Sequence, residues 1–480
     1  MIIGAEIRKN RSENSSLKAA GFYDDALNFI GHATGYPTDS NNKPSGNQDL
    51  STEVGFFANA NYMYNNRYYA DFVYRLSGSS KFGSNKRYGE FWSGGLGWNL
   101  HNENFLKFEK LNLLKIRGSV GYTGKVNFEP FQSITMYKYE NTLEYLHGIG
   151  AIPQTIGNDD LKWEREFSYN IGADISLFDR RLNATLDFYL KRTKDLVLDA
   201  SIAPSTGVVS GKQNIGEMEN KGFEFSVDGF IIQRNDVWWQ LGMNGSTNKN
   251  RILKISNALK RQNELNNDVA PTRQTPAPLA QYEEGESTSA LKVVRSAGID
   301  PATGREVFIK LDGTRTFTYS ADDKVVVGDT DPRFYGNVYT NVFYKGFSLY
   351  IMGSFKCGGY LYNVTRASRV EGTTGRTNVD RRAFDSRWKE VGDIALYRNI
   401  TEHSVPQQTD RFVEKENVLT ITSVNLGYEF PQRICQKMML RNLRLGVNLS
   451  DILRFSNVKV ERGLDYLYGN GFEFTLSTTF

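Results

Sequence analysis

The sequence predicts an all-β fold: a transmembrane antiparallel β-barrel with long extracellular loops. Three observations lead there. About fourteen segments alternate apolar and polar residues, their connections alternate between short and long, and the composition is rich in Tyr (26), Phe (30) and Gly (44) but poor in Pro (12). Mean hydropathy is negative, but alternating transmembrane strands give only a weak hydropathy signal. Composition alone would also fit a soluble β-sandwich, propeller or solenoid.

The clearest strand is EFSYNIGADISLF, which separates its residues into two faces. One face is apolar and the other polar: Phe167, Tyr169, Ile171, Ala173, Ile175 and Leu177 against Glu166, Ser168, Asn170, Gly172, Asp174 and Ser176. RLNATLDFYLK alternates in the same way. The remaining strands are expected near 1–12, 51–65, 67–82, 88–102, 111–126, 213–234, 237–253, 333–344, 347–363, 416–430, 442–450 and 472–480.

The connections between these strands decide between a barrel and a soluble fold. Tight turns are expected at 65–66, 178–181, 235–236 and 345–346, with longer ones at 103–110 and 431–439. The alternate connections span 13–50, 127–160, 200–212, 254–332, 364–415 and 457–470, with a shorter one at 83–87. Outer-membrane barrels have short periplasmic turns and long extracellular loops. A sandwich has no reason to place every long loop at one end.

The polar sides of the strands are expected to line a wide, wet lumen, because isolated polar groups are costly in an apolar interior. Aromatic residues near strand ends fit membrane-interface girdles, although ordinary cross-strand packing would also account for them. These residues are Trp92, Trp98, Trp163, Trp238, Trp239, Tyr344 and Tyr428.

Charge and motifs point away from catalysis and cofactors. The net charge of +4 is too balanced to indicate nucleic-acid binding. Cys357 and Cys435 lack a metal-binding spacing, and the four histidines form no HExxH pattern. We therefore expect no enzyme, no bound cofactor and no nucleic-acid partner. The first residues, MIIGAEIRKN, do not resemble a signal peptide, so we expect the start of a longer protein to be missing.

Several strings resemble landmarks of the SusC/RagA-type TonB-dependent outer-membrane transporters, in the same order along nearly the whole chain. They are YRLSGSSKFG with FWSGGLGWNL, LLKIRGSVGYTGKVN, NDDLKWEREFSYNIGADISLFDRRL, FYLKRTKDLVL, IGEMENKGFEFSV, GIDPATGREVFIKLDG, DPRFYGNVYTNVFYKGFSLYIMGSF and VNLGYEFP. The chain departs from the family pattern at Asn337, where Gly is usual, at Lys125, where Gly-Asn is more common before the next loop, and in a short final loop.

The resemblance implies that residues 1–480 are the C-terminal portion of the barrel, about the last 14 of 22 strands. The large extracellular loops would span about 13–50, 127–160, 254–332 and 364–415. The N-terminal plug domain and about eight strands would lie upstream. Exposed strand edges are costly in lipid, so only a closed barrel persists. Because about eight upstream strands would complete the ring, we expect the first and fourteenth strands not to pair with each other. Phe480 would be the terminal aromatic insertion signal of a multi-pass barrel in the cell outer membrane.

The family's function is active import of oligosaccharides, or in some members peptides, beneath a SusD-like surface lipoprotein. TonB would supply the energy through the missing N-terminal region, while this chain would form the pore wall and vestibule against outer-membrane lipid. Three alternatives stay open: a TonB-dependent receptor for a siderophore or vitamin chelate, a passive barrel, and a soluble carbohydrate-active enzyme.

Aromatic residues in the long loops are the candidates for glycan or peptide contact, because apolar sugar faces stack on aromatic rings. They are Phe22, Tyr23, Tyr36, Tyr145, Tyr360, Trp388 and Tyr397; loop packing or lid docking is the competing interpretation. Asp322, Asp323, Asp329 and Asp331 could hold a structural Ca²⁺, but a solvated acidic loop fits their spacing better.

Overall fold

The main body of the protein is one antiparallel sheet of fourteen strands, in which each strand pairs with its sequence neighbours along the barrel. The computed structural model describes residues 1–26, 28–37, 44–145, 148–202, 204–208, 210–272, 276–373, 379–459, 461 and 469–479. The strands of this sheet are β1 (Ile2–Ser16), β2 (Ser45–Tyr64), β3 (Tyr68–Ser79), β4 (Tyr88–Asn99), β5 (Leu111–Lys125), β8 (Glu164–Leu177), β9 (Leu182–Lys194), β12 (Glu217–Arg234), β13 (Val237–Lys254), β18 (Phe334–Tyr344), β19 (Phe347–Tyr362), β20 (Val413–Glu429), β21 (Asn442–Ser456) and β22 (Gly471–Thr479). All fourteen predicted strands are confirmed.

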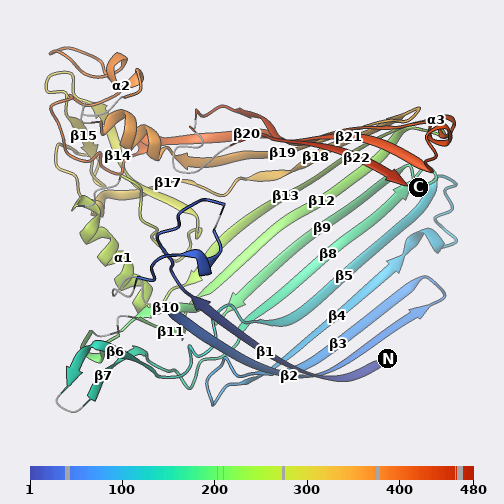
Figure 1. Cartoon of the computed structure of the whole chain (residues 1–480), viewed down its shortest axis with the longest axis horizontal. Helices are drawn as coiled ribbons and strands as arrows, with labels where there is room; N and C mark the ends of the chain where they lie inside the picture. Colours follow the sequence, from blue (N-terminus) through green and yellow to red (C-terminus); the bar gives the residue numbers. More distant parts are fainter. Residues whose placement is uncertain are drawn as a thin grey trace.

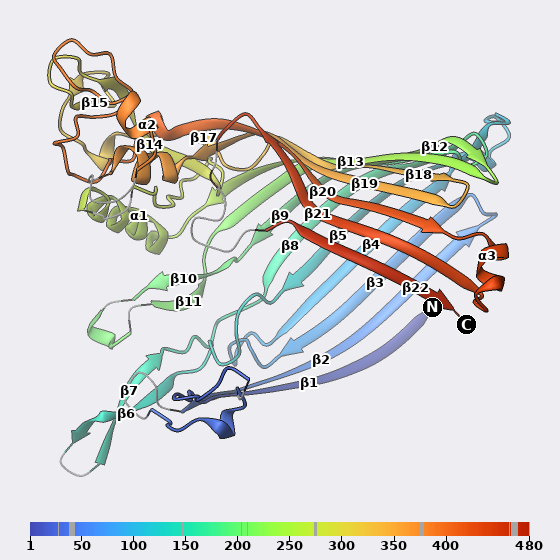
Figure 2. The ribbon, with the colours of Figure 1, turned by 45° about the horizontal axis from the view of Figure 1, so that its top comes forward.

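The sheet curves into a wall and does not close on itself (Figures 1 and 2). Among the described residues, β1 pairs with β2 alone and β22 with β21 alone, so these two strands are the edges. This confirms the expectation that the first and last strands do not pair with each other.

Short and long connections lie at opposite ends of the wall (Figure 1). The short end carries tight turns such as 65–67, 178–181 and 345–346, together with helix α3 (Gln432–Lys437). Positive backbone φ angles at Asn65, Asn66 and Lys345 suit two-residue hairpin turns. The predicted asymmetry of the connections is therefore confirmed.

The long connections contain more regular structure than the sequence analysis anticipated. Short alternating runs within them pair locally, and such runs are hard to distinguish from loop. The additional strands are β6 (Met136–Tyr145), β7 (Gly148–Thr155), β10 (Val197–Ser201), β11 (Ser210–Asn214), β14 (Ala290–Ile299), β15 (Glu306–Ile309), β16 (Arg315–Thr316) and β17 (Lys324–Asp329). The helices of the long connections and η2 of the short end are η1 (Ile30–His32), η2 (Leu100–Asn102), η3 (Pro204–Thr206), α1 (Asn257–Val269), η4 (Ala270–Thr272), η5 (Ala321–Asp323), η6 (Arg366–Glu371), α2 (Arg382–Asp385) and η7 (Asp410–Phe412).

Among the described residues, no helix has the length and apolar character needed to cross a membrane.

The strand register keeps one polar and one apolar face across the whole sheet. Arg117, Gly172 and Asp187 lie side by side on the polar face of β5, β8 and β9. On the opposite face, Ile171 is 64% exposed and its neighbour Phe188 is 60% exposed. Large apolar side chains exposed in rows on a sheet face indicate contact with lipid. We therefore assign the polar face to the barrel interior.

Aromatic side chains form two bands on the apolar face, one near each end of the wall. At the turn end, Tyr68 stacks with Trp98, and Phe347 lies 4.4 Å from Tyr428 between ring centroids. Near the loop end, the band comprises Trp92, Phe167, Tyr169, Phe188, Phe223, Phe225, Phe334 and Phe355. Such bands are typical of the two membrane–water interfaces.

The girdle prediction is wrong for two of the seven aromatic residues. Trp163 packs 4.3 Å from the ring of buried Phe82 in a small core beneath the loops. Trp238 shares the polar face with Gln240 and stacks on Phe343. Both rings pack against other protein side chains and do not face lipid. Their positions near strand ends in the sequence could not reveal this.

Candidate functional site

The interior face between β9 and β22 is rich in amide and phenol groups. Tyr189 on β9 donates from its hydroxyl to Asn248 Oδ1 on β13, reaching across β12 at 3.1 Å. Asn337 donates both its backbone N–H and its side-chain amide to Asn244 Oδ1 at 3.2 Å. Asn337, a departure from the family pattern, is thus bound to the neighbouring strand β13.

A hollow of about 560 Å³ lies in this wall between β18 and β22. Its polar lining side chains include Asn341, Tyr350, Asn425, Arg444, Asn448 and Ser477. Asparagine amides both donate and accept hydrogen bonds, so such a surface suits neutral solutes with many hydroxyl or amide groups.

One arginine on the interior wall is clamped between carboxylates of two strands. Arg117 on β5 contacts Asp174 on β8 at 3.2 Å and Asp187 on β9 at 2.6 Å. Gly172 lies beneath this contact, where a Cβ atom would come within 2.5 Å of Asp187 Oδ1 and 2.7 Å of Arg117 Cζ. A side chain at this position would force Arg117 and Asp187 to shift out of this arrangement.

Above the wall, two long connections fold together into one body, here called the loop module: residues 290–329 and 363–412. Its core consists of Leu291, Val293, Ala367 and Phe412, which pack with Tyr362 at the end of β19, and all five are buried. Residues 408–409 run alongside β14, where Val294 donates its backbone N–H to the Gln408 carbonyl. Figure 1 places this module at the loop end of the wall.

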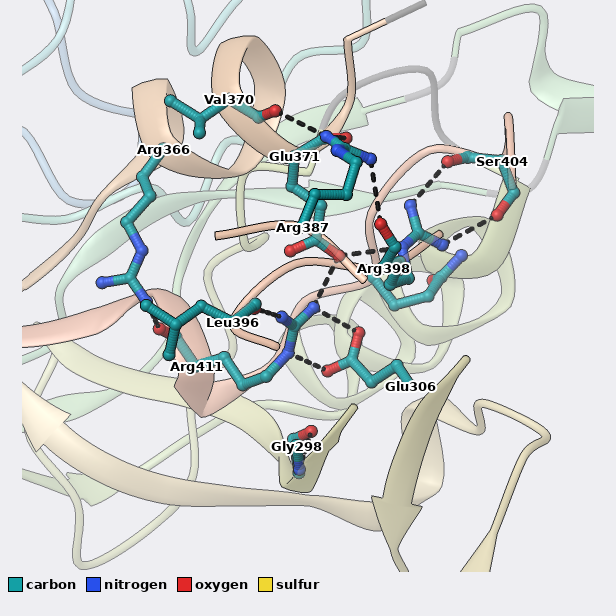
Figure 3. A network of polar contacts seen from close by, with 12 residues as sticks. Gly298, Glu306, Arg366, Val370, Glu371, Arg387, Leu396, Arg398, Ser404 and Arg411 are labelled. Atoms are coloured by element: carbon teal, nitrogen blue, oxygen red, sulfur yellow. Dashed lines mark hydrogen bonds and ion pairs between the residues drawn. The ribbon is translucent and has the colours of Figure 1, made fainter. Parts of the chain in front are cut away.

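A buried ion network joins the two halves of the loop module (Figure 3). Arg411 binds both carboxylate oxygens of Glu306 at 2.8 Å and one oxygen of Glu371 at 2.7 Å. Arg398 binds the same oxygen of Glu371 at 2.8 Å. Two guanidinium groups thus balance two carboxylates, and the side chains of Glu306 and Glu371 are 2% and 0% exposed. Buried charges are tolerated only when they are paired in this way.

A third arginine caps backbone oxygens in the same network. Arg387 donates to the carbonyls of Val370, Glu371, Ala383 and Arg398 at 2.8–3.1 Å. Burial lowers the pKa of its guanidinium and raises the pKa of the Tyr319 hydroxyl. Burial also raises the pKa of Asp410, although the backbone N–H of Ser296 hydrogen-bonds to its carboxylate. These groups lie in the interior of the module, where Arg387 fastens its backbone segments together.

Three predicted contact residues lie exposed in the loop between β1 and β2. Phe22 is 40%, Tyr23 88% and Tyr36 47% exposed, and Tyr36 donates its hydroxyl to the carbonyl of Ile30. Tyr145 ends β6, which pairs with β7 in a separate two-stranded sheet. The structure therefore does not bring all seven predicted residues to one place.

The other three predicted contact residues belong to the packing of the loop module. Tyr397 is only 4% exposed and packs with Val370 and Ala383. Tyr360 is half-buried, lies within β19 rather than a loop, and packs against the module core. Trp388 donates its indole N–H to the Pro301 carbonyl at 2.9 Å. Tyr397 in particular is too buried to stack on a solute. Phe480 lies outside the described residues.

The four aspartates weighed as a calcium site do not converge. Asp322 and Asp323 precede β17, whereas Asp329 and Asp331 lie at its far end. Asp323 accepts from the Leu311 backbone and Asp329 from the Ser289 hydroxyl. The described part of the chain contains no cluster of three or more His, Cys, Asp or Glu residues that could hold a metal.

Sequence reasoning missed the network of Arg411, Glu306, Glu371 and Arg398. Arg411 lies 105 residues from Glu306 and 40 from Glu371. No short spacing links them, so only the tertiary fold could reveal the network.

Comparison with known proteins places these features in a family. Residues 10–448 match the model described as "TonB dependent receptor-like, beta-barrel". TonB-dependent receptor P3 of Formosa agariphila is 27% identical over 473 residues, which cover 95% of this chain and 46% of that protein. TonB-dependent receptor SusC of Bacteroides thetaiotaomicron is 35% identical over 214 residues, covering 43% of this chain and 21% of that protein.

The fold also resembles a solved structure, the RagAB peptide transporter. The TM-score is 0.80 at 23% identity, with 95% of this chain and 49% of that chain covered. This chain thus spans about half the length of the structure and of P3, the curated relative it matches along most of its length. From the family match over most of its length, the chain belongs to the TonB-dependent receptor-like β-barrel family, is of its SusC/RagA type, and lies in the outer membrane.

Proposed function

We propose that this chain forms the pore wall and extracellular vestibule of an importer that takes up oligosaccharides with energy supplied through TonB. The observation that carries the proposal is the interior wall, where amide and phenol side chains recur strand after strand. They are Asn170, Tyr189, Asn220, Asn244, Asn248, Tyr335, Asn337, Tyr339, Asn341, Tyr350, Asn425 and Asn448.

Neutral sugars offer dense hydroxyl groups and apolar ring faces, which such amides and aromatic rings complement. Exposed Phe22, Tyr23 and Tyr36 would provide first contacts at the vestibule. The relative described as a peptide transporter makes peptides the competing solute class, and a surface lipoprotein of the SusD type is the proposed lid partner.

The loop module supports the vestibule assignment in a different way. Its buried ion network holds segments 290–329 and 363–412 as one body at the loop end. A rigid platform at the mouth of a barrel positions a solute or a lid more reproducibly than free loops would.

The experiment that tests the proposal is disruption of the gene in its own organism, followed by uptake of fluorescent oligosaccharides and peptides. We expect uptake of one oligosaccharide class to be lost, while peptide uptake and growth under iron limitation are unchanged. Loss of peptide uptake alone would mean that the solutes are peptides and not oligosaccharides. A defect only under iron or vitamin limitation would instead support a chelate receptor.

The vestibule residues are tested by Tyr23→Ala combined with Tyr36→Ala in the full-length protein. Loss of stacking on two rings should weaken oligosaccharide binding by about tenfold. Tyr397→Phe is the matched control, because its buried ring keeps its packing. Unchanged binding in the double variant would remove these two residues from the proposed contact surface.

A further inference from the structure

The lipid-facing side of four adjacent strands changes from aromatic to basic at the loop end. Phe188 and Phe223 are neighbours in the aromatic band of β9 and β12. The next outward positions toward the loops are occupied mainly by cationic side chains. We call six of these the basic patch: Arg165, Arg192, Lys194, Lys221, Lys249 and Arg251.

The centre of the basic patch is a pair of like charges. Lys221 on β12 lies directly opposite Lys249 on β13, and both side chains are exposed. Like charges at directly opposed positions destabilise an antiparallel sheet. Neither lysine forms an ion pair with a described residue. An anion bound between them would remove the repulsion.

The carboxylates around the patch only partly neutralise it. Glu217 pairs with Arg192 at 3.0 Å, and Asp195 pairs with Arg165 at 2.6 Å. Glu219 lies in register between Arg192 and Arg251. Six cationic side chains against these three carboxylates leave a net charge of +3 (6 − 3) on this outward surface.

The depth of the patch indicates what kind of anion it meets. It lies just beyond the aromatic band, on the outward face and toward the long loops, where the headgroups of the outer leaflet are expected. Basic clusters at this depth bind anionic headgroups, and guanidinium and ammonium groups both bind phosphate. We propose that the basic patch binds phosphate groups on the headgroups of outer-leaflet lipids. The proposal is independent of which solute the protein imports.

The test compares lipid binding by the purified full-length protein and by the double variant Lys221→Gln, Lys249→Gln. The probe is diphosphoryl lipid A in mixed micelles, with its dephosphorylated form measured in parallel. Each lysine removed near an anionic headgroup should weaken binding by about fivefold, so the double variant should bind about 25-fold more weakly. The dephosphorylated lipid should show no such difference. Equal binding by variant and wild type would overturn the proposal.

Two further variants separate lipid binding at the patch from a general effect of charge, and inorganic phosphate tests whether the patch binds a free anion. Lys191→Gln removes a charge from the interior face of β9, the strand that carries Arg192 and Lys194 of the basic patch, and should leave lipid binding unchanged. Lys249→Glu places an opposite charge across from Lys221, so the lipid-free protein should become more heat-stable while lipid binding falls. If inorganic phosphate stabilised the protein against heat as much as the lipid does, the patch would be a site for free anions and the proposal would be overturned. A gain in lipid binding by Lys249→Glu would also overturn it.

Discussion

Two arginines of this protein are each held between two carboxylates, in very different surroundings. Arg411 in the loop module is 10% exposed, and its partners Glu306 and Glu371 are 2% and 0% exposed. Arg117 on the barrel wall is 32% exposed, with Asp174 and Asp187 at 26% and 16%. The contact distances in the two clusters are alike, so the clusters differ in how far water reaches the charged groups. We infer that the ion pairs hold the two segments of the loop module together, whereas the wall is held by its strand ladder and its ion pairs shape the interior surface.

The largest expected effect is that of Arg411→Ala. It would leave Glu306 without its ion-pair partner in a dry interior, which typically costs about 3–5 kcal/mol. We expect the loop module to become sensitive to protease within residues 290–329 and 363–412, while the strands of the wall stay protected.

The matched control is Arg381→Ala, which removes an arginine of the same module that is 89% exposed and pairs with Asp385. Its cost should stay below about 1 kcal/mol. Equal protease sensitivity in the two variants would show that the buried network does not hold the module together.

Trp388→Ala should have an intermediate effect and separates packing from solute contact. The indole covers Gly304, where a Cβ atom would come within 2.6 Å of the ring, and its N–H donates to the Pro301 carbonyl. Because the ring is only partly buried, the cost should be about 2 kcal/mol, below the 3–5 kcal/mol of a fully buried tryptophan.

The measurement is urea-dependent proteolysis of the module, with solute binding recorded in parallel. Trp388→Phe should recover much of the stability. If Trp388→Ala kept wild-type stability but lost solute binding, Trp388 would be a solute-contact residue after all.

The contrast between wall and module also explains what the sequence could predict. A strand of the wall carries its own signature, since lipid on one side and water on the other impose strict alternation, as in Phe167 to Leu177. All fourteen strands and the end occupied by each connection followed from that local rule.

The loop module obeys no local rule. Arg411 pairs with a residue 105 positions away, and Tyr397 is buried by segments that only the tertiary fold brings together. An aromatic residue in a long loop can face solvent, as Tyr23 does, or the core of the module. The sequence pattern is the same in both cases, so the sequence could name the candidate contact residues but could not tell the exposed ones from the buried ones.

Arg117→Met should have a smaller effect than either module variant. Asp174 and Asp187 would remain hydrated in the wet interior, so we expect a loss of about 1 kcal/mol. The temperature at which the folded protein loses its compact mobility in detergent electrophoresis measures this loss.

The loss should shrink in 1 M salt, because exposed charges are screened, whereas that of Arg411→Ala should not. A cost for Arg117→Met as large and as salt-independent as that of Arg411→Ala would remove the distinction between the two clamps.

The smallest expected effect is that of Asp410→Asn, and it should depend on pH. Burial raises the pKa of Asp410, so the folded module favours the protonated form. The stability contributed by that preference is fully present below the unfolded pKa of about 3.9 and is lost as pH rises through the folded pKa.

The asparagine carbonyl can still accept the hydrogen bond from the Ser296 backbone N–H. The variant should therefore resist urea-dependent proteolysis of the module slightly better than wild type at pH 7, with the advantage disappearing near pH 3.5. A variant that is less stable at pH 7 would mean that the hydrogen bond and the positive charge around the Asp410 carboxylate outweigh the cost of its burial.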